Sequence, residues 1–270
     1  MPSNLGQNWI LLRGLSRESA HWGSFVNLME STFPDASLTL LDLPGTGYLH
    51  KAASPTAIID FVEQVRCSAL EQNCLNQPAT ILALSLGAMV AWEWLLSYPD
   101  EICGAALIGT SFAGLSPWYQ RLRWQSYGRL LGLIRQKTME DRELAILQLV
   151  SNRRDQDGQI KEQWEKIQTE RPVNIKNTYR QILAAAAYKP DDRKPKQPVL
   201  LMHGRGDKLV APECSAAIQK KWNLPLEMHP WGGHDLPLDD DLWVISRLKK
   251  WIDIRLEASL FFFDIKNLHL

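Results

Sequence analysis

A serine set between a strand-like run and a helix-like segment constrains this chain more than any other feature. Ala79–Leu84 is an apolar run of strand length, and residues 86–98 are apolar on most faces of a helix. Ser85 separates the two, and small residues, Ala83 and Gly87, stand two positions before and after it. This pattern is typical of a nucleophile elbow, a sharp strand-to-helix turn that lifts a serine hydroxyl clear of a sheet. It predicts a buried strand, a strained serine and a buried helix, in that order.

Apolar runs of strand length alternate with helical patterns in both the first and the last part of the chain. Besides Ala79–Leu84, the expected strands are residues 9–12, 38–41, 104–108, 199–202 and 226–229. Such alternation predicts an α/β fold with a mostly parallel, doubly wound sheet of about six strands and helices on both faces.

Several helix boundaries can be predicted from local signals. Ser54 followed by Pro55 predicts an N-cap with proline at the first helical position. Thr138 with Asp141 resembles a capping box. Apolar residues at helical spacing predict a final amphipathic helix over residues 239–256.

The alternation stops between residues 115 and 189, where helical patterns occur without a convincing strand. Charge changes there too. Residues 115–190 hold fourteen Lys and Arg against eight Asp and Glu, in a chain with a formal net charge of zero. We interpret this segment as a helical cap inserted over the sheet. The expected organisation is a core of residues 1–114 and 190–256, a cap of residues 115–189 and a tail of residues 257–270.

Composition argues against several classes of protein. An apolar fraction of 45% supports a sizeable core and argues against disorder. Zero net charge gives no overall attraction to nucleic acid or to an anionic membrane. No apolar run reaches the length of about 18 residues that a membrane-spanning helix needs, and no signal peptide is visible. We expect no nucleic-acid or membrane partner, and a monomer or a homodimer.

The cysteines lack the spacing of a metal or redox motif. They are expected to be free, buried thiols in a reducing cytoplasm: Cys67, Cys74, Cys103 and Cys214. No His/Cys/Asp cluster has metal-ligand spacing, and the Gly-containing turn at residues 42–47 lacks the pattern of a phosphate-binding loop. We expect neither a metal nor an organic cofactor.

An acyl-transfer serine needs a base, an acid that orients the base, and donors for an oxyanion. Asp207 lies in a Gly-rich turn after an expected strand, and His234 lies in a glycine-flanked loop before the last helix. Each has a plainer interpretation, because Asp207 could bond to its own turn and His234 could have no role. The order Ser85, Asp207, His234 is nevertheless that of one particular serine-hydrolase fold, which the other serine-hydrolase folds do not share.

Other residues compete for these roles or complete them. The remaining histidines are His21, His50, His203, His229 and His269. His203 ends a strand and is interpreted as a packed or capping residue, whereas His21 lies in the first loop and is expected to line the site. The oxyanion donors are expected to be the backbone N–H groups of Leu86, at a helix N-terminus, and of Leu15, just after the first strand.

Taken together, these motifs resemble the α/β-hydrolase family. The matching segments are residues 10–14 with Trp22, 42–47, 83–87, 202–207 and 232–234. The resemblance covers nearly the whole chain outside the insertion. It implies a Ser85–His234–Asp207 triad, an oxyanion hole from Leu15 and Leu86, and a helical cap.

Two residues depart from the family pattern. Arg13 stands where the family usually has the histidine of a His-Gly loop, and Ala83 stands where it usually has the first glycine of the elbow. Within the family, the compact size and the cap resemble the pimeloyl-carrier-protein methyl ester esterase group of biotin synthesis. They are also similar to the small synthase of the menaquinone pathway.

The expected activity is hydrolysis of a carboxylic ester or thioester through an acyl-enzyme on Ser85. A C–C bond hydrolase or lyase, or an acyltransferase, would use the same triad. A non-catalytic binding protein of this fold is a further alternative, although such proteins usually have a broken triad.

The cap is expected to set specificity for a small-molecule ester, whether free or bound to a carrier. Trp118, Tyr119 and Trp124 cluster at its start and are expected to line the cleft. The arginines among them are interpreted as solvated. The sequence does not predict the acyl chain length, or whether the Phe-rich tail packs on the body or on a second subunit.

Overall fold

Six parallel strands form one sheet in the order β2-β1-β3-β4-β5-β6. The computed structural model describes residues 4–267. The strands are β1 (Asn8–Leu12), β2 (Ser37–Leu41), β3 (Ala79–Leu84), β4 (Ile102–Ile108), β5 (Val199–Gly204) and β6 (Leu226–His229). The predicted doubly wound sheet is confirmed, and each expected strand is present to within two residues at either end.

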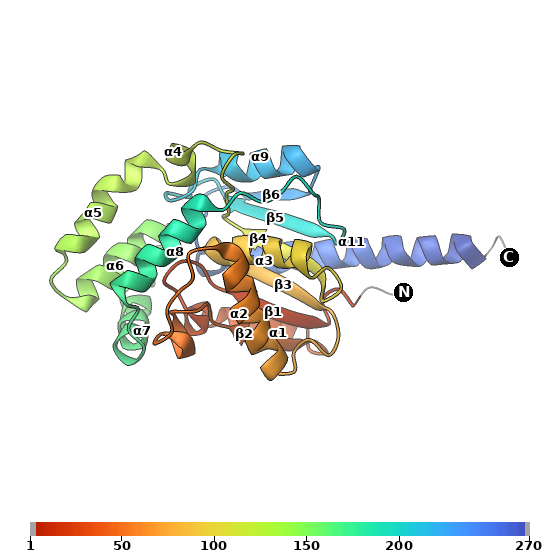
Figure 1. Cartoon of the computed structure of the whole chain (residues 1–270), viewed down its shortest axis with the longest axis horizontal. Coiled ribbons are helices and arrows are strands. Elements are labelled where there is room, and N and C mark those ends of the chain that lie inside the picture. The colour runs from red at the N-terminus through yellow and green to blue at the C-terminus, as the bar shows by residue number, and fades with distance from the viewer. Residues whose placement is uncertain (1–3, 268–270) are drawn as a thin grey trace.

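Helices cover both faces of the sheet (Figure 1). One apolar cluster joins the strands to α2 (Ile58–Glu71), α3 (Leu86–Ser97) and α9 (Pro212–Trp222). A second cluster joins them to α1 (Phe25–Thr32) and α11 (Asp241–Asn267). The helices thus form an outer layer on each side of the sheet.

Side chains of strand β3 pack against the helices on both faces of the sheet. Ile81 and Ala83 belong to the first cluster, whereas Leu82 and Leu84 belong to the second. Successive side chains of a strand point to opposite faces, so a strand covered on both sides is mainly apolar, and the buried Thr80 hydroxyl accepts a hydrogen bond from the Gly6 N–H. This explains why Ala79–Leu84 has no polar-apolar alternation.

Residues 118–187 contain five α-helices, grouped at one end of the molecule (Figure 1). They are α4 (Trp118–Arg121), α5 (Tyr127–Arg135), α6 (Met139–Val150), α7 (Asp157–Glu170) and α8 (Ile175–Ala187). The predicted N-cap at Thr138 is confirmed, because its side chain accepts a hydrogen bond from the Asp141 backbone N–H. Leu147, Trp164 and Ile167 form a small apolar core of their own in this group.

Short elements complete the chain. They are the 3₁₀ turns η1 (Ser19–Trp22), η2 (Gly47–Leu49) and η3 (Trp124–Ser126), and the one-turn helix α10 (Leu236–Asp239). Helix α11 follows α10 and extends beyond the body as far as Asn267 (Figure 1). Much of the expected tail therefore continues this helix, and residues 268–270 lie outside the described residues.

The predicted helix start at Ser54 is wrong. Helix α2 begins at Ile58, with Ala57 as its N-cap. Ser54 is fully buried, and its hydroxyl donates to the carbonyl oxygen of Pro44 at 2.7 Å. Its side chain thus anchors the loop after β2 and is not available to cap a helix, a tertiary use that a local Ser-Pro signal cannot indicate.

Two expectations about the environment of the chain can be compared with the structure. The cysteines are free, as predicted, but Cys67 is exposed and only Cys214 is fully buried. Among residues 4–267, no helix combines the length and the apolar character needed to cross a membrane.

Candidate active site

Ser85 occupies a strained turn between β3 and α3. Its φ is +56° and its ψ is −113°, a combination that residues other than glycine rarely adopt. The turn is held by the Ser85 N–H, which donates to the carbonyl oxygen of Ile108 at 2.8 Å. A methyl group on Gly87 would lie only 2.4 Å from the carbonyl oxygen of Arg13, so the loop after β1 fits against the turn because residue 87 has no side chain.

The turn lies at the point where the strand order of the sheet reverses. Strand β1 has β2 on one side and β3 on the other, so the chain leaves β1 and β3 in opposite directions, which is where open parallel sheets generally bind ligands. A methyl group on Gly14, in the loop after β1, would lie 3.0 Å from the Ser85 Cβ. The first loop therefore reaches the candidate nucleophile directly.

The residues after β1 and β3 include the two backbone donors expected for an oxyanion, the N–H groups of Leu15 and Leu86. Within the described part of the chain, the N–H groups of Leu15 and Leu86 make no hydrogen bond. Leu86 is the first residue of α3, where unpaired N–H groups and the helix dipole favour negative charge. Such a pair of N–H groups is suited to bind an oxyanion formed at Ser85.

Asp207 and His234 are in direct contact. The Nδ1 atom of His234 lies 2.7 Å from Oδ2 of Asp207, and both residues are at least nineteen-twentieths buried. The other carboxylate oxygen, Oδ1, accepts hydrogen bonds from the backbone N–H groups of Leu209 at 2.7 Å and Val210 at 2.9 Å. The turn after β5 thus fixes the carboxylate, and the carboxylate fixes the imidazole.

Opposite pKa shifts accompany this contact. Burial alone would raise the pKa of Asp207, but the charge of His234 and hydrogen bonds from His203 and His234 outweigh it, so the pKa is lowered. Burial alone would lower the pKa of His234, but the charge and hydrogen bond of Asp207 outweigh it, so the pKa is raised. The pair therefore favours an ionised acid beside a histidine that readily takes up a proton.

Ser85 and His234 both contact the short segment that follows β4. The Thr110 hydroxyl donates to the Ser85 carbonyl oxygen at 3.2 Å. A methyl group on the neighbouring Gly109 would lie 3.2 Å from Nδ1 of His234. The nucleophile candidate and the base candidate thus both lie beside the carboxyl end of β4, and among the described residues no hydrogen bond joins them.

His203 is a second histidine on the same carboxylate. Its Nε2 lies 3.2 Å from Oδ2 of Asp207 and 3.1 Å from the Val210 carbonyl oxygen, and its Nδ1 lies 2.7 Å from the Ser215 hydroxyl. Because a carbonyl can only accept, Nε2 of His203 carries a proton. His203 is therefore a packed residue, as expected, but it also stabilises the charge of Asp207.

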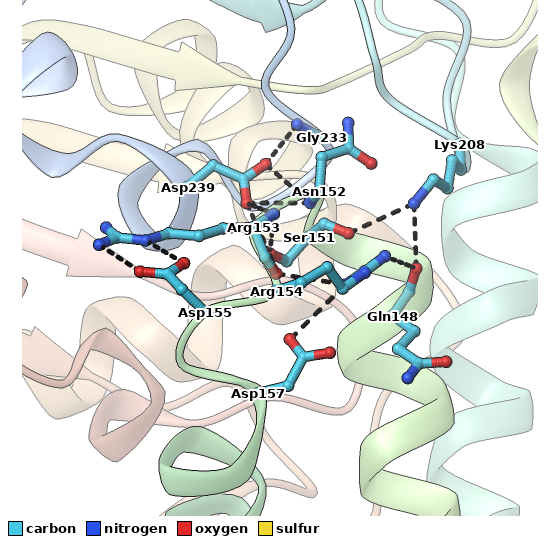
Figure 2. Close-up of polar contacts among 10 residues, drawn as sticks. All are labelled: Gln148, Ser151, Asn152, Arg153, Arg154, Asp155, Asp157, Lys208, Gly233 and Asp239. Carbon is cyan, nitrogen blue, oxygen red and sulfur yellow. Dashed lines mark hydrogen bonds and ion pairs between the residues drawn. The ribbon is translucent and has the colours of Figure 1, made fainter.

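The loop between α6 and α7 contacts the loops that carry Asp207 and His234. Figure 2 shows it beside Lys208 and Gly233, the sequence neighbours of these two residues. The buried Asp239 carboxylate faces this loop and accepts hydrogen bonds from Ser151, Asn152 and Arg153, and also from the Gly233 N–H. These bonds connect the helices of residues 118–187 to the residue that precedes His234.

Two further contacts complete this connection. The Asn152 side chain donates to the carbonyl oxygens of Gly206 at 3.0 Å and Trp231 at 2.8 Å, so it contacts both loops at once. The Asp235 N–H donates to the Val150 carbonyl oxygen at 2.9 Å. The loop at residues 150–153 is thus wedged between the acid-bearing and base-bearing loops.

The predicted substrate-contacting residues lie in two different environments. His21 is buried beside Arg17 at 3.0 Å and packs edge-on against Trp164, between the first loop and α7. Burial, followed by the charges of Arg17 and Arg13, lowers its pKa well below the usual value. Trp118, Tyr119 and Trp124 are exposed, with Trp118 packed against Tyr119. Among the described residues, no hydrogen bond, ion pair or ring contact joins any of these four to Asp207 or His234. Their substrate-binding role therefore stays a prediction.

Several site residues could not be identified from the sequence. Arg13 and Asp235 form a buried ion pair, and Asp239 supports the loop of residues 150–153. Asp235 directly follows His234, and Arg13 was noted only as a departure from a family pattern. A buried charge needs a partner, so charged residues next to motif residues indicate a buried ion pair. The sequence does not show which partner each one meets.

Residues 4–267 contain no group of three or more His, Cys, Asp or Glu side chains that could hold a metal ion.

Known proteins resemble this chain along most of its length. The family model of the alpha/beta hydrolase fold matches residues 10–241. None of the curated proteins matches the sequence closely enough to indicate a relationship.

Solved structures show the same fold at low sequence identity. The esterase RhEst1 from Rhodococcus sp. ECU1013 has a TM-score of 0.71 and 17% identity, covering 91% of this chain and 90% of that chain. The esterase EaEST from Exiguobacterium antarcticum has a TM-score of 0.70 and 15% identity, covering 92% of each chain. A lipase-esterase related protein from Clostridium acetobutylicum ATCC 824 has a TM-score of 0.69 and 16% identity, covering 91% of this chain and 94% of that chain. The closer resemblance to the pimeloyl-carrier-protein methyl ester esterase group stays a prediction.

Proposed function

This chain belongs to the α/β-hydrolase family, and we propose that it is a serine hydrolase that cleaves a carboxylic ester or thioester through an acyl-enzyme. The observation that carries this proposal is the buried 2.7 Å contact between Asp207 and His234, at the sheet edge where Ser85 occupies its strained turn. A structural turn needs no buried acid–base pair beside it, whereas an acyl-transfer site does.

In the proposed reaction, the Ser85 Oγ attacks the carbonyl carbon of the ester. Its proton passes to Nε2 of His234, the ring nitrogen that does not contact Asp207. The N–H groups of Leu15 and Leu86 stabilise the oxyanion. The C–O bond to the leaving alcohol then breaks, and His234 returns the proton to that alcohol.

Deacylation repeats the sequence with water. His234 removes a proton from a water molecule, which attacks the acyl carbonyl. The bond from the acyl carbon to Ser85 Oγ then breaks, His234 returns the proton to that oxygen, and the acid leaves. Asp207 remains ionised throughout, holds the imidazole in one tautomer and stabilises the imidazolium that forms. The hydrogen bonds from His203, Leu209 and Val210 keep the carboxylate in place.

The substrate is proposed to be a small-molecule ester selected by the helices of residues 118–187. These helices contact the loops on which Asp207 and His234 lie, so the shape of the cap and the position of the base are linked. The free thiols fit a reducing cytoplasm, where we propose that the enzyme works.

A rate profile over p-nitrophenyl esters of increasing acyl length tests the proposal and measures the acyl slot. We expect saturable hydrolysis with an optimum chain length, and a loss of about 10⁴-fold or more in kcat for Ser85→Ala. The circular dichroism spectrum and Tm of that variant should match the wild type. Unchanged turnover in Ser85→Ala would exclude the assignment, and absence of turnover on all esters would favour a non-catalytic binding protein.

A further inference from the structure

A buried ion pair joins the loop after β1 to the loop that carries His234. Nη1 of Arg13 donates to Oδ1 of Asp235 at 3.3 Å, and Nη2 donates to Oδ2 in the same bidentate contact. Only 3% of the Arg13 side chain and 4% of the Asp235 side chain are exposed. The Arg13 guanidinium also lies 4.8 Å from the centre of the Trp22 ring.

Each partner is adjacent in sequence to a residue of the proposed reaction. Arg13 directly precedes Gly14 and Leu15, the residues that approach Ser85 and supply an oxyanion donor. Asp235 directly follows His234. A bidentate guanidinium–carboxylate contact has a fixed planar geometry, so it fixes the distance between the two loops.

The charges of the pair also act on His234. Asp235 raises the pKa of this histidine and Arg13 lowers it, and both effects are smaller than that of Asp207. While both partners are present, their effects on the histidine oppose each other. Removing one partner would leave the charge of the other uncompensated in a buried site.

The other charged groups near His234 are the same whether or not one partner of the Arg13–Asp235 pair is removed. Asp207 faces it from the loop after β5 and is shared with His203. Asp239 contacts the Gly233 N–H and the loop at residues 150–153. The segment after β4 presents the uncharged Gly109.

We propose that Arg13 and Asp235 are positioning residues, whose ion pair holds the loop that carries Leu15 and the loop that carries His234 at a fixed distance across Ser85. Their opposite charges also offset each other at this contact. The inference rests on the proposed serine-hydrolase function. It also gives a physical reason for an arginine at the position where the family usually has histidine.

The pH dependence of inactivation by a fluorophosphonate tests this proposal, because the inactivation rate follows the neutral form of His234. Four variants are compared with the wild type: Arg13→Gln, Asp235→Asn, the double variant of both, and Arg13→Lys. Arg66→Gln is the matched control, since Arg66 on α2 forms a partly buried ion pair with Glu101, which directly precedes β4 and lies away from the site.

In a plot of inactivation rate against pH, the midpoint is the pH at which the rate reaches half of its maximum. The two single variants should move this midpoint in opposite directions. We expect Arg13→Gln to raise it and Asp235→Asn to lower it, each by at least about half a pH unit. The midpoint of the double variant should return toward the wild-type value. Its inactivation should stay about 10-fold or more slower than that of the wild type, because the two loops are no longer held at a fixed distance. Arg13→Lys should keep the wild-type midpoint, and Arg66→Gln should change neither quantity.

Shifts in the same direction, or no shift in either single variant, would overturn the proposal. If Arg13→Gln does not fold, Asp235→Asn decides alone, because its midpoint must fall while that of Arg66→Gln does not. Failure of the proposed function has a different signature, since the wild type itself would then not be inactivated at any pH.

Discussion

The two carboxylate oxygens of Asp207 perform two different tasks. Oδ1 accepts from the backbone N–H groups of Leu209 and Val210, as a turn aspartate does, whereas Oδ2 faces His234 and His203. The turn interpretation and the acid interpretation of this residue are therefore compatible. The turn fixes the side chain so that its second oxygen is available to the imidazole.

The raised pKa of His234 has a consequence for the pH dependence of the reaction. The base must be neutral to accept the Ser85 proton, so kcat/KM should rise with pH and reach half of its plateau above the ordinary histidine value of about 6.5. Ester hydrolysis measured between pH 5 and 9 checks this, with Tm recorded over the same range to exclude unfolding. A half-plateau below the ordinary value would contradict the account.

At the residue scale, the sequence predicts groups that follow local rules and misses those that depend on distant partners. Ser85, Asp207 and His234 each lie in a short Gly-containing motif at a strand end, so their positions could be predicted. Arg13 and Asp235 are 222 positions apart in the chain, and only the folded sheet brings them together. Their partnership could not be predicted without the fold.

At the scale of elements, the connection between α6 and α7 is part of the support of the site. The Asp239 carboxylate accepts hydrogen bonds from three consecutive residues, 151–153, and from Gly233 beside His234 (Figure 2). A carboxylate that satisfies several buried donors is costly to replace, because each donor would be left without a partner. The α6–α7 connection is therefore joined to the loop that carries His234 by buried polar contacts.

Replacing this carboxylate should loosen the connection. We expect Asp239→Asn to lower the free energy of unfolding by about 2–3 kcal/mol, because its amide nitrogen would face N–H donors. KM for esters should rise more than kcat falls, since the cap helices would be held less firmly. Urea unfolding and steady-state kinetics measure both effects.

Asp155→Asn is the matched control for this prediction. Asp155 pairs with Arg153 on the same loop, but its side chain is 60% exposed (Figure 2). Its removal should leave stability and KM unchanged, because exposed ion pairs contribute little. Equal effects of the two substitutions would argue against a specific role of Asp239.

Element prediction succeeds where periodicity is strong and fails where tertiary contacts replace local ones. The apolar run of β3 and the Thr138 cap of α6 were both predicted correctly. Ser54 was misread because its hydroxyl bonds to Pro44, ten positions earlier. The length of α11 was also underestimated, since the helix continues past the apolar stripe to Asn267.

At the scale of the whole molecule, the fold brings five separate segments of the chain to one sheet edge. The loops after β1, β3, β4, β5 and β6 all begin there, and residues 150–153 contact two of them. A parallel sheet has this consequence because all of its strands point the same way. One chemical site is therefore assembled from residues that extend from Arg13 to Asp239.

The most direct test of the account is the site of covalent modification by a fluorophosphonate. We predict one adduct per chain by intact mass, mapped by peptide sequencing to Ser85, and no adduct in Ser85→Ala. Asp207→Asn should slow the modification strongly while leaving its position unchanged. Modification at another serine, or a wild-type chain that stays unmodified while folded, would contradict the central claim that Ser85 is the nucleophile.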